Sequence, residues 1–134
     1  MRLALFQPDI PQNLGAALRL AACMGVPLDV IEPCGFPLSD AAIHRAAMDY
    51  SGLAQVKRHA GWSDFRADSG ASGRLVLFTT RAATPVHDFA FSAEDVLLFG
   101  RESAGRRYAV ALPQRLPSRI VHCMRPKPSC CAPL

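Results

Sequence analysis

The feature that most constrains the fold is the run Val96–Phe99, four consecutive apolar residues that stop at Gly100. Such a run is typical of a strand buried on both faces, as in parallel sheets. A carboxylate, a hydroxyl and a second glycine follow at Glu102, Ser103 and Gly105. A strand that ends in glycine and a polar turn is how an open α/β sheet builds a site beyond its strand ends. A buried strand that ends in an ordinary loop is the alternative.

Short apolar runs alternate with helical patterns along the whole chain, and hairpin signals are absent. This alternation predicts one α/β domain over residues 1–134, with a mostly parallel sheet flanked by helices. Ser39 or Asp40 is expected to cap the second helix, and Ser63 the third. Strands are expected at 3–6, 27–31, 54–59, 75–78, 96–99 and 119–121, and helices from 13 to 24, from 39 to 47 and from 62 to 67; residues 85–91 read as irregular or as a short strand.

The first helix has the clearest pattern. Pro8 and Pro11 are expected to bracket a rigid turn, after which Asn13 caps the helix. Gly25 suits the left-handed position at its end. Arg19 falls off the apolar stripe, so it should face solvent or a ligand, and an ordinary surface charge is the simpler interpretation. The stripe itself consists of Leu14, Ala17, Leu18, Ala21 and Ala22.

Composition excludes some classes of protein. No apolar run approaches the roughly 20 residues that span a bilayer, and the apolar N-terminal run is too short for a signal peptide. The five cysteines have no framework spacing, which indicates reduced thiols and a cytoplasmic protein. The net charge of +4 and the pI near 9.0 fit either simple solubility or a polyanionic partner such as RNA.

Common catalytic and metal motifs do not occur. The sequence has no Walker P-loop, G-x-G-x-x-G, H-E-x-x-H or G-x-S-x-G motif. His122–Cys123 and Cys130–Cys131 offer soft ligands, but six residues separate the pairs, whereas structural zinc sites usually space cysteines two to four apart. We therefore predict no metal site. Glu102 has no second carboxylate nearby, and a charge at a helix start is its simplest interpretation.

Several stretches together resemble the SPOUT-class RNA 2′-O-methyltransferases. They are similar to the small single-domain branch that methylates the ribose of the tRNA wobble nucleotide. Each motif alone is weak, but together they occur in family order and at family spacing over residues 1 to about 105. The stretches are 8–15 with Arg19 and Gly25, 31–38, 48–50, 77–80 and 97–105.

The resemblance implies a deep C-terminal trefoil knot that binds S-adenosylmethionine, in a homodimer that acts on the anticodon region of tRNA. It implies that Phe78, Thr79, Gly100 and Glu102 line the cofactor pocket, mostly with backbone groups. His122 and Cys130 stand where the family's last strand and the loop after it contribute, and they complete the expected cofactor-binding set.

The resemblance also implies that Asn13 and Arg19 are catalytic. They would face the ribose and phosphate of the target nucleotide, with Arg19 helping to activate the 2′-hydroxyl. Methyl transfer is an in-line displacement in which positioning does most of the work. A guanidinium beside a phosphate can stabilise the developing alkoxide, so no metal is required.

The sequence departs from the family after Gly105. Residues 120–126 keep a trace of the family strand, but the final helix is missing, so the C-terminus looks divergent and truncated. The tail resembles a reading-frame change or a degenerated gene copy. It predicts that residues 106–134 pack poorly, that the knot is open or shallow, and that activity is impaired. The alternatives are a non-catalytic RNA-binding or dimerising remnant and, more weakly, a different α/β ligand-binding domain.

Overall fold

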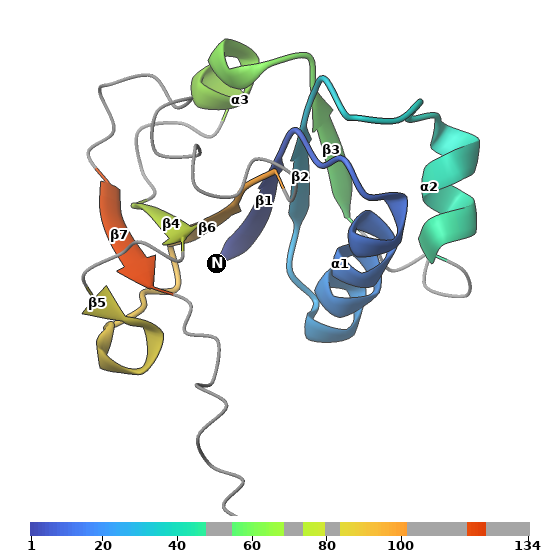
Figure 1. Cartoon of the computed structure of the whole chain (residues 1–134). Helices are drawn as coiled ribbons and strands as arrows, with labels where there is room; N and C mark the ends of the chain where they lie inside the picture. Colours follow the sequence, from blue (N-terminus) through green and yellow to red (C-terminus); the bar gives the residue numbers. More distant parts are fainter. Residues whose placement is uncertain (48–54, 69–73, 80–83, 102–117, 123–134) are drawn as a thin grey trace, which may run out of the picture.

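The protein is built on one parallel sheet (Figure 1). The computed structural model describes residues 1–47, 55–68, 74–79, 84–101 and 118–122. The strands of these residues form a seven-stranded sheet in the order β3-β2-β1-β6-β4-β7-β5, and every pair is parallel. The predicted parallel α/β fold is confirmed. The strands are β1 (Arg2–Phe6), β2 (Leu28–Ile31), β3 (Val56–His59), β4 (Leu75–Thr79), β5 (Thr84–Pro85), β6 (Val96–Phe99) and β7 (Ser118–His122).

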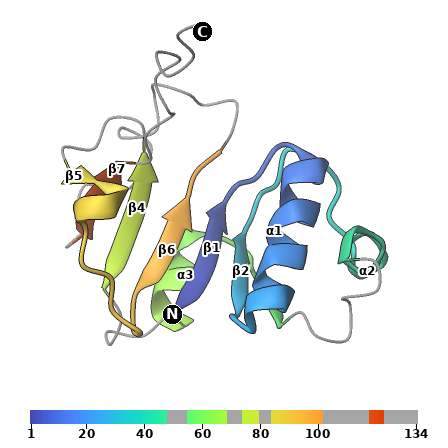
Figure 2. The same ribbon diagram turned by 90° about the horizontal axis from the view of Figure 1, so that it is seen from below.

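Helices cover both faces of the sheet. α1 (Pro11–Met24) and α2 (Asp40–Ala47) lie on one face, and α3 (Trp62–Asp68) lies on the other (Figure 2). A short 3-10 turn, η2 (Val86–Asp88), lies beside β5 on the side of α1. No helix in the described part of the chain is both long and apolar enough to cross a membrane.

Alternation along the strands divides the core into two layers. On β2, Leu28 and Val30 pack with α1, whereas Ile31 joins Phe65 of α3 and the Phe6 ring of β1. All four residues of β2 are buried, because helices cover this strand on both sides. Side chains of successive residues point to opposite faces of a strand, so a strand covered twice is apolar almost throughout.

The start of α1 differs from the prediction. The helix begins at Pro11. Proline suits this first position because it has no N–H group, and an N–H there would have no partner within the helix. Ile10 occupies the N-cap position without a side-chain hydrogen bond, so the prediction that Asn13 caps the helix is wrong. The end and the stripe are confirmed. Gly25 has φ 63°, and Leu14, Leu18, Ala21 and Ala22 are buried.

Of the predicted helix caps and strand burial, some are confirmed and others are wrong. Ser39 Oγ accepts a hydrogen bond from the Ala42 N–H at 3.1 Å, as expected of a cap for α2. Ser63 is the second residue of α3 and cannot cap it. Val96 and Leu98 are buried under α3, but Leu97 and Phe99 are only partly buried on the other face. The prediction that this strand is fully buried on both faces is therefore wrong.

Part of the C-terminal segment joins the sheet. β7 pairs with β4 over five positions, from Leu75↔Ser118 to Thr79↔His122, and with β5 at two. This confirms the strand predicted at 119–121, so residues 118–122 of the segment expected to pack poorly belong to the sheet. A register shared with β4 provides backbone hydrogen bonds that do not depend on side-chain pattern. Residues 102–117 and 123–134 lie outside the described residues.

A buried carboxylate holds the beginning of β6. The Asp95 side chain is 0 % exposed and accepts two hydrogen bonds from Arg74, at 2.8 Å from Nε and 2.7 Å from Nη2. It also accepts the Ser92 N–H at 2.7 Å. The hydrogen bonds from Arg74, helped by the one from Ser92, hold the pKa of Asp95 below its usual range. The carboxylate therefore links the loop before β6 to the start of β4.

We predict that Asp95→Asn lowers the free energy of unfolding by about 1.5–3 kcal/mol at neutral pH, the usual contribution of a hydrogen bond to a charged group. Because the pKa of Asp95 is lowered on folding, its stabilisation is full above the ordinary pKa and is lost as the pH falls through the native value. The difference between the two proteins should therefore shrink below about pH 4. Urea denaturation at several pH values measures it.

The matched control is Glu94→Gln, which removes the neighbouring exposed carboxylate. We expect this variant to unfold within about 0.5 kcal/mol of the wild type. An Asp95→Asn protein that unfolds like the control at neutral pH would contradict the role given to Asp95.

Candidate functional site

The strand order changes direction at β1. The chain proceeds from β1 outward to β2 and β3, whereas β6 and β4 lie on the other side of β1. In an open α/β sheet the loops diverge at such a point, and a crevice forms beyond the carboxyl ends of the two strands. The candidate site is therefore the edge where β1 and β6 end.

Three loops meet at this edge. Arg101, just after β6, donates a hydrogen bond from Nε to Asp9 Oδ2 at 3.2 Å, which joins the loop after β6 to the loop after β1. The Gly35 N–H, in the loop after β2, donates to the Pro8 carbonyl at 2.9 Å. Loops that are distant in the sequence thus form one cluster.

Gly35 is required by close packing in this cluster. A Cβ at position 35 would lie 2.5 Å from the Asp9 Cβ and 2.9 Å from the Asp9 Cα. Side chains essentially never approach backbone atoms so closely, so only glycine lets the two loops come together. Glycine at this position is therefore what allows the contact.

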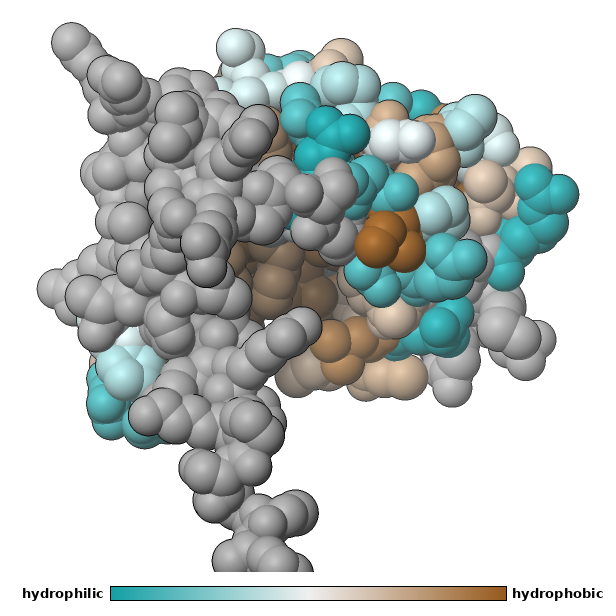
Figure 3. Space-filling model, in the orientation of Figure 1, coloured by the Kyte–Doolittle hydropathy of each residue, from teal (hydrophilic) through white to brown (hydrophobic). Residues whose placement is uncertain are grey.

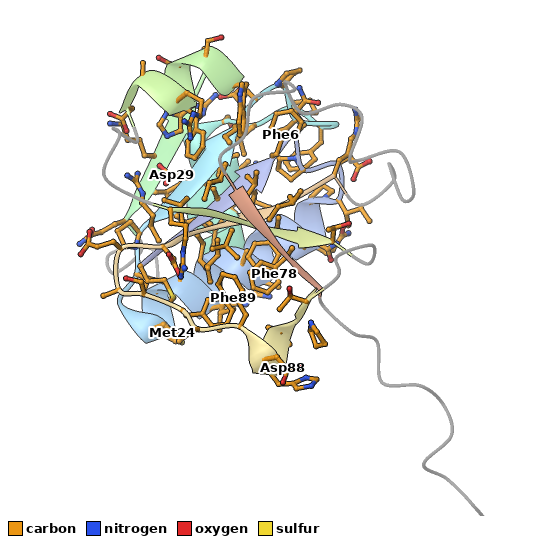
Figure 4. The ribbon with its side chains drawn as sticks, turned by 90° about the vertical axis from the view of Figure 1, so that its left-hand side faces the viewer. Phe6, Met24, Asp29, Phe78, Asp88 and Phe89 are labelled. Atoms are coloured by element: carbon orange, nitrogen blue, oxygen red, sulfur yellow. The ribbon has the colours of Figure 1, made fainter. Side chains whose placement is uncertain are left out.

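Aromatic rings form an apolar surface beside the cluster. Phe78 and Phe99 are register partners on β4 and β6, and their rings stack with centroids 4.7 Å apart at 21°. Phe91 also stacks with Phe78, with ring centroids 6.2 Å apart at 11°. Figure 4 shows Phe78 with Phe89 on the side of the sheet that carries Met24, away from Phe6 and Asp29. Phe78 and Phe99 are only partly buried.

The structure brings together several of the residues expected to bind the cofactor. Thr79 follows Phe78 and Gly100 follows Phe99, so both lie where their strands end. His122 is in backbone register with Thr79 and ends β7 at the same edge. Glu102 and Cys130 lie outside the described residues.

The two residues expected to be catalytic both lie on α1, at different depths. Asn13 is exposed in the first turn, near the loop cluster, and Arg19 is half-buried. Six residues of helix separate them by about 9 Å along the axis and about 240° around it. They therefore do not share one face of α1, and any ligand of both must reach from the end of the helix along its flank.

Asp9, Gly35 and Arg101 were not among the predicted site residues. Asp9 and Arg101 have opposite charges and each follows a predicted strand closely. That signal becomes useful only when the two strands are known to be neighbours, because 92 residues separate the pair. Gly35 lies in a predicted turn, and the sequence does not indicate that Asp9 packs against it.

A second polar cluster lies on the opposite face, under α3. Asp29, His59 and Asp68 place ligand-type atoms within 4.8 Å of one another. Asp29 Oδ1, however, already accepts from Arg2 Nη2 at 2.6 Å and contacts His59 Nε2 at 2.8 Å. Lys57 forms an ion pair with Asp68, and its hydrogen bond lowers the pKa of Asp68. Two cations thus already neutralise both carboxylates, so this cluster does not favour a metal ion.

The fold and the edge site define an open α/β protein whose loops cluster at the carboxyl ends of β1 and β6. Residues 1–114 match the SpoU rRNA Methylase family. The chain therefore belongs to the SpoU family of methyltransferases, and the resemblance seen in the sequence is confirmed.

Individual relatives agree with this assignment. A protein of Beijerinckia indica called tRNA (cytidine(34)-2'-O)-methyltransferase is 53% identical over 109 residues, which cover 81% of this chain and 68% of that one. A protein of Burkholderia pseudomallei with the same name is 40% identical over 124 residues, covering 87% and 80%.

Solved structures share the fold. The structure described as "Structural insights into the 2-OH methylation of C/U34 on tRNA" is 34% identical, with a TM-score of 0.79 over 95% of this chain and 81% of that one. The SpoU methyltransferase AviRb of Streptomyces viridochromogenes has a TM-score of 0.70 over 96% of this chain and 53% of its own, at 22% identity, and supports the fold alone.

Proposed function

We propose that the protein transfers a methyl group from S-adenosylmethionine to the ribose 2′-hydroxyl of nucleotide 34, the wobble position, of a tRNA. The observation that carries this proposal is the 53% identity to a protein named for that reaction. The 34% identical structure concerned with methylation of C/U34 supports the same substrate. A tRNA substrate also supports a cytoplasmic location for the proposed reaction.

The ends of β4 and β6 fit the proposed cofactor. The half-buried rings of Phe78 and Phe99 offer an apolar surface for a base, and the backbones of Thr79 and Gly100 follow directly. This combination of an apolar wall and a few polar groups is typical of a nucleoside site. When bound, S-adenosylmethionine supplies an electrophilic methyl group on its sulfonium. Phe78, Thr79 and Gly100 would hold it, with His122, Glu102 and Cys130 as further proposed contacts.

Asn13 and Arg19 are the proposed catalytic residues. The end of α1 that carries Asn13 has no side-chain cap and no acidic residue in its first turn, so its dipole favours an approaching phosphate. A guanidinium is already protonated. Arg19 would therefore act by stabilising the negative charge that develops on the 2′-oxygen, and positioning supplies much of the remaining acceleration.

The path of the C-terminal segment supports the proposed knot. β5 follows β4 after four residues, yet β7 lies between these two strands in the sheet. The chain that leaves β6 must therefore return and insert next to β4, which brings His122 beside Thr79. We propose that residues 1–134 form a single domain, and that it forms the trefoil knot of the family in place of the open or shallow knot predicted from the tail.

A homodimer is proposed from the outward face of α1. Leu20 is 53 % exposed, Met24 is 65 % exposed, and Ile10 before the helix is 39 % exposed. Figure 3 shows hydrophobic side chains on the surface over α1 among hydrophilic ones. Large apolar side chains gathered on one helix face indicate a surface for a partner.

We predict that Arg19→Ala reduces methyl transfer to tRNA by at least about 100-fold, the usual loss when a donor to a developing oxyanion is removed. S-adenosylmethionine should bind the variant as it binds the wild type, with micromolar affinity by calorimetry, because α1 does not carry the proposed cofactor contacts. The free energy of unfolding should change by less than about 1 kcal/mol, since alanine favours a helix.

Arg66→Ala, on the exposed surface of α3, is the control and should transfer methyl groups normally. Retained activity in Arg19→Ala would exclude the role of Arg19. A wild-type protein that binds no S-adenosylmethionine would instead favour a non-catalytic remnant of the fold.

We predict that Leu20→Glu shifts the protein from dimer to monomer, because it places a charge in the centre of the proposed interface. Light scattering after size-exclusion chromatography measures the mass. Gln12→Glu, at an exposed position in the first turn of the same helix, should leave the mass unchanged. If both variants have the mass of the wild type, α1 is not the interface.

A further inference from the structure

We propose that Asp9, Gly35 and Arg101 form a clasp that positions the first turn of α1 against the Gly100 turn, and thereby sets the rate of methyl transfer. The inference rests on the proposed function, since its rate readout needs that reaction. It assigns the three residues a positioning role, in which none has to touch the substrate.

The ion pair of the clasp joins the loop after β1 to the loop after β6. Arg101 Nε and Asp9 Oδ2 are 3.2 Å apart, and the side chains are 40 % and 11 % exposed. Solvent at the Arg101 end screens the pair and limits its contribution to stability. Its main consequence is therefore geometric: it fixes one loop relative to the other.

Gly35 holds Asp9 from the opposite side. Its backbone packs so closely on Asp9 that a Cβ would lie 2.5 Å from the Asp9 Cβ and 3.6 Å from Arg101 Nη2. The Gly35 N–H also donates to the Pro8 carbonyl. Asp9 thus lies between the closely packed backbone of Gly35 and the guanidinium of Arg101, which holds its carboxylate.

The two ends of the clasp lead directly to the two halves of the proposed site. Asp9 precedes Pro11, the first residue of α1, by two positions, and the Asn13 N–H donates to the Ile10 carbonyl between them. Arg101 follows Gly100 directly. A shift of Asp9 therefore moves the turn that carries Asn13 relative to Gly100. A misplacement of about 1 Å at a reacting centre can reduce a rate about 100-fold.

A second ion pair at the same edge provides a matched control. Arg58 Nη2 lies 2.9 Å from Glu32 Oε1, with side chains 36 % and 28 % exposed. Arg58 lies within the edge strand β3, and the pair joins this strand to Glu32, the residue that follows β2. It has a similar charge and exposure but does not connect α1 to the Gly100 turn.

The test is a double-variant cycle on the full-length protein with Arg101→Gln, Gly35→Ala and the combination. We expect each single variant to lower kcat for tRNA methylation about tenfold, with the KM for tRNA and the Kd for S-adenosylmethionine changed less than about twofold. Because both changes act by displacing Asp9, the double variant should be no slower than the slower single one. Arg58→Gln should keep the kcat of the wild type.

Hydrogen exchange tests the clasp independently of methyl transfer, through the exchange rates of backbone amides near it. In Arg101→Gln, the amide of Gly35 and the first-turn amide of Asn13 should exchange faster than in wild type or in Arg58→Gln, while the melting temperature stays the same. Unchanged exchange would overturn the proposal even in a protein that methylates no tRNA. A raised KM with normal kcat would also overturn it, since Arg101 would then contact the RNA itself. Multiplicative losses in the double variant would likewise exclude a shared action through Asp9.

Discussion

The pairing of β1 with both β2 and β6 is the constraint on which the rest of the structure depends. Leu3 and Ala4 of β1 are buried, and the strand has a parallel neighbour on each side. Parallel neighbours end at the same edge, so the loops that leave β1, β2 and β6 start next to one another there. The loop cluster around Asp9 and the start of α1 are thus consequences of burying one strand at the centre of the sheet.

The two edges of the sheet use ion pairs differently. At the amino ends of the strands, Asp95 is fully buried and takes two hydrogen bonds from Arg74. Removing a partner there would leave a buried charge, so this pair stabilises the fold. At the carboxyl ends, Arg101 and Asp9 are partly in solvent, and little stability depends on them. Because the stabilising pair lies at the opposite edge, the conformation of the site loops can be determined by the needs of the reaction and not by stability.

Periodicity predicted the elements well because hydrophobic burial decides most of them. The stripe from Leu14 to Ala22 and the strand at 96–99 follow directly from it. Capping was less predictable, since Pro11 can begin a helix and thereby displaces Asn13 from the cap. The resemblance led to Phe78, Thr79 and Gly100, whose meeting at one edge the strand order then explains. The sequence could not predict the cluster of Asp9, Gly35 and Arg101. Their contact depends on which strands are neighbours in the sheet, and spacing along the sequence does not contain that information.

The buried cluster under α3 shows how the register of β1 and β2 is specified. Asp29 is the polar residue of a strand that is otherwise apolar, and it lies on the same face as Ile31. Its Oδ1 serves both Arg2 and His59, whereas Asp29 Oδ2 and Arg2 Nε lack hydrogen-bond partners in the described part of the chain. An incompletely satisfied network of this kind adds little net stability. A slip of β2 by one residue, however, would move the carboxylate to the α1 face, among Leu14 and Leu18, where burying an unpaired charge is far more costly. The cluster therefore acts by excluding wrong pairings, and a correct register at β2 is what brings Gly35 to Asp9.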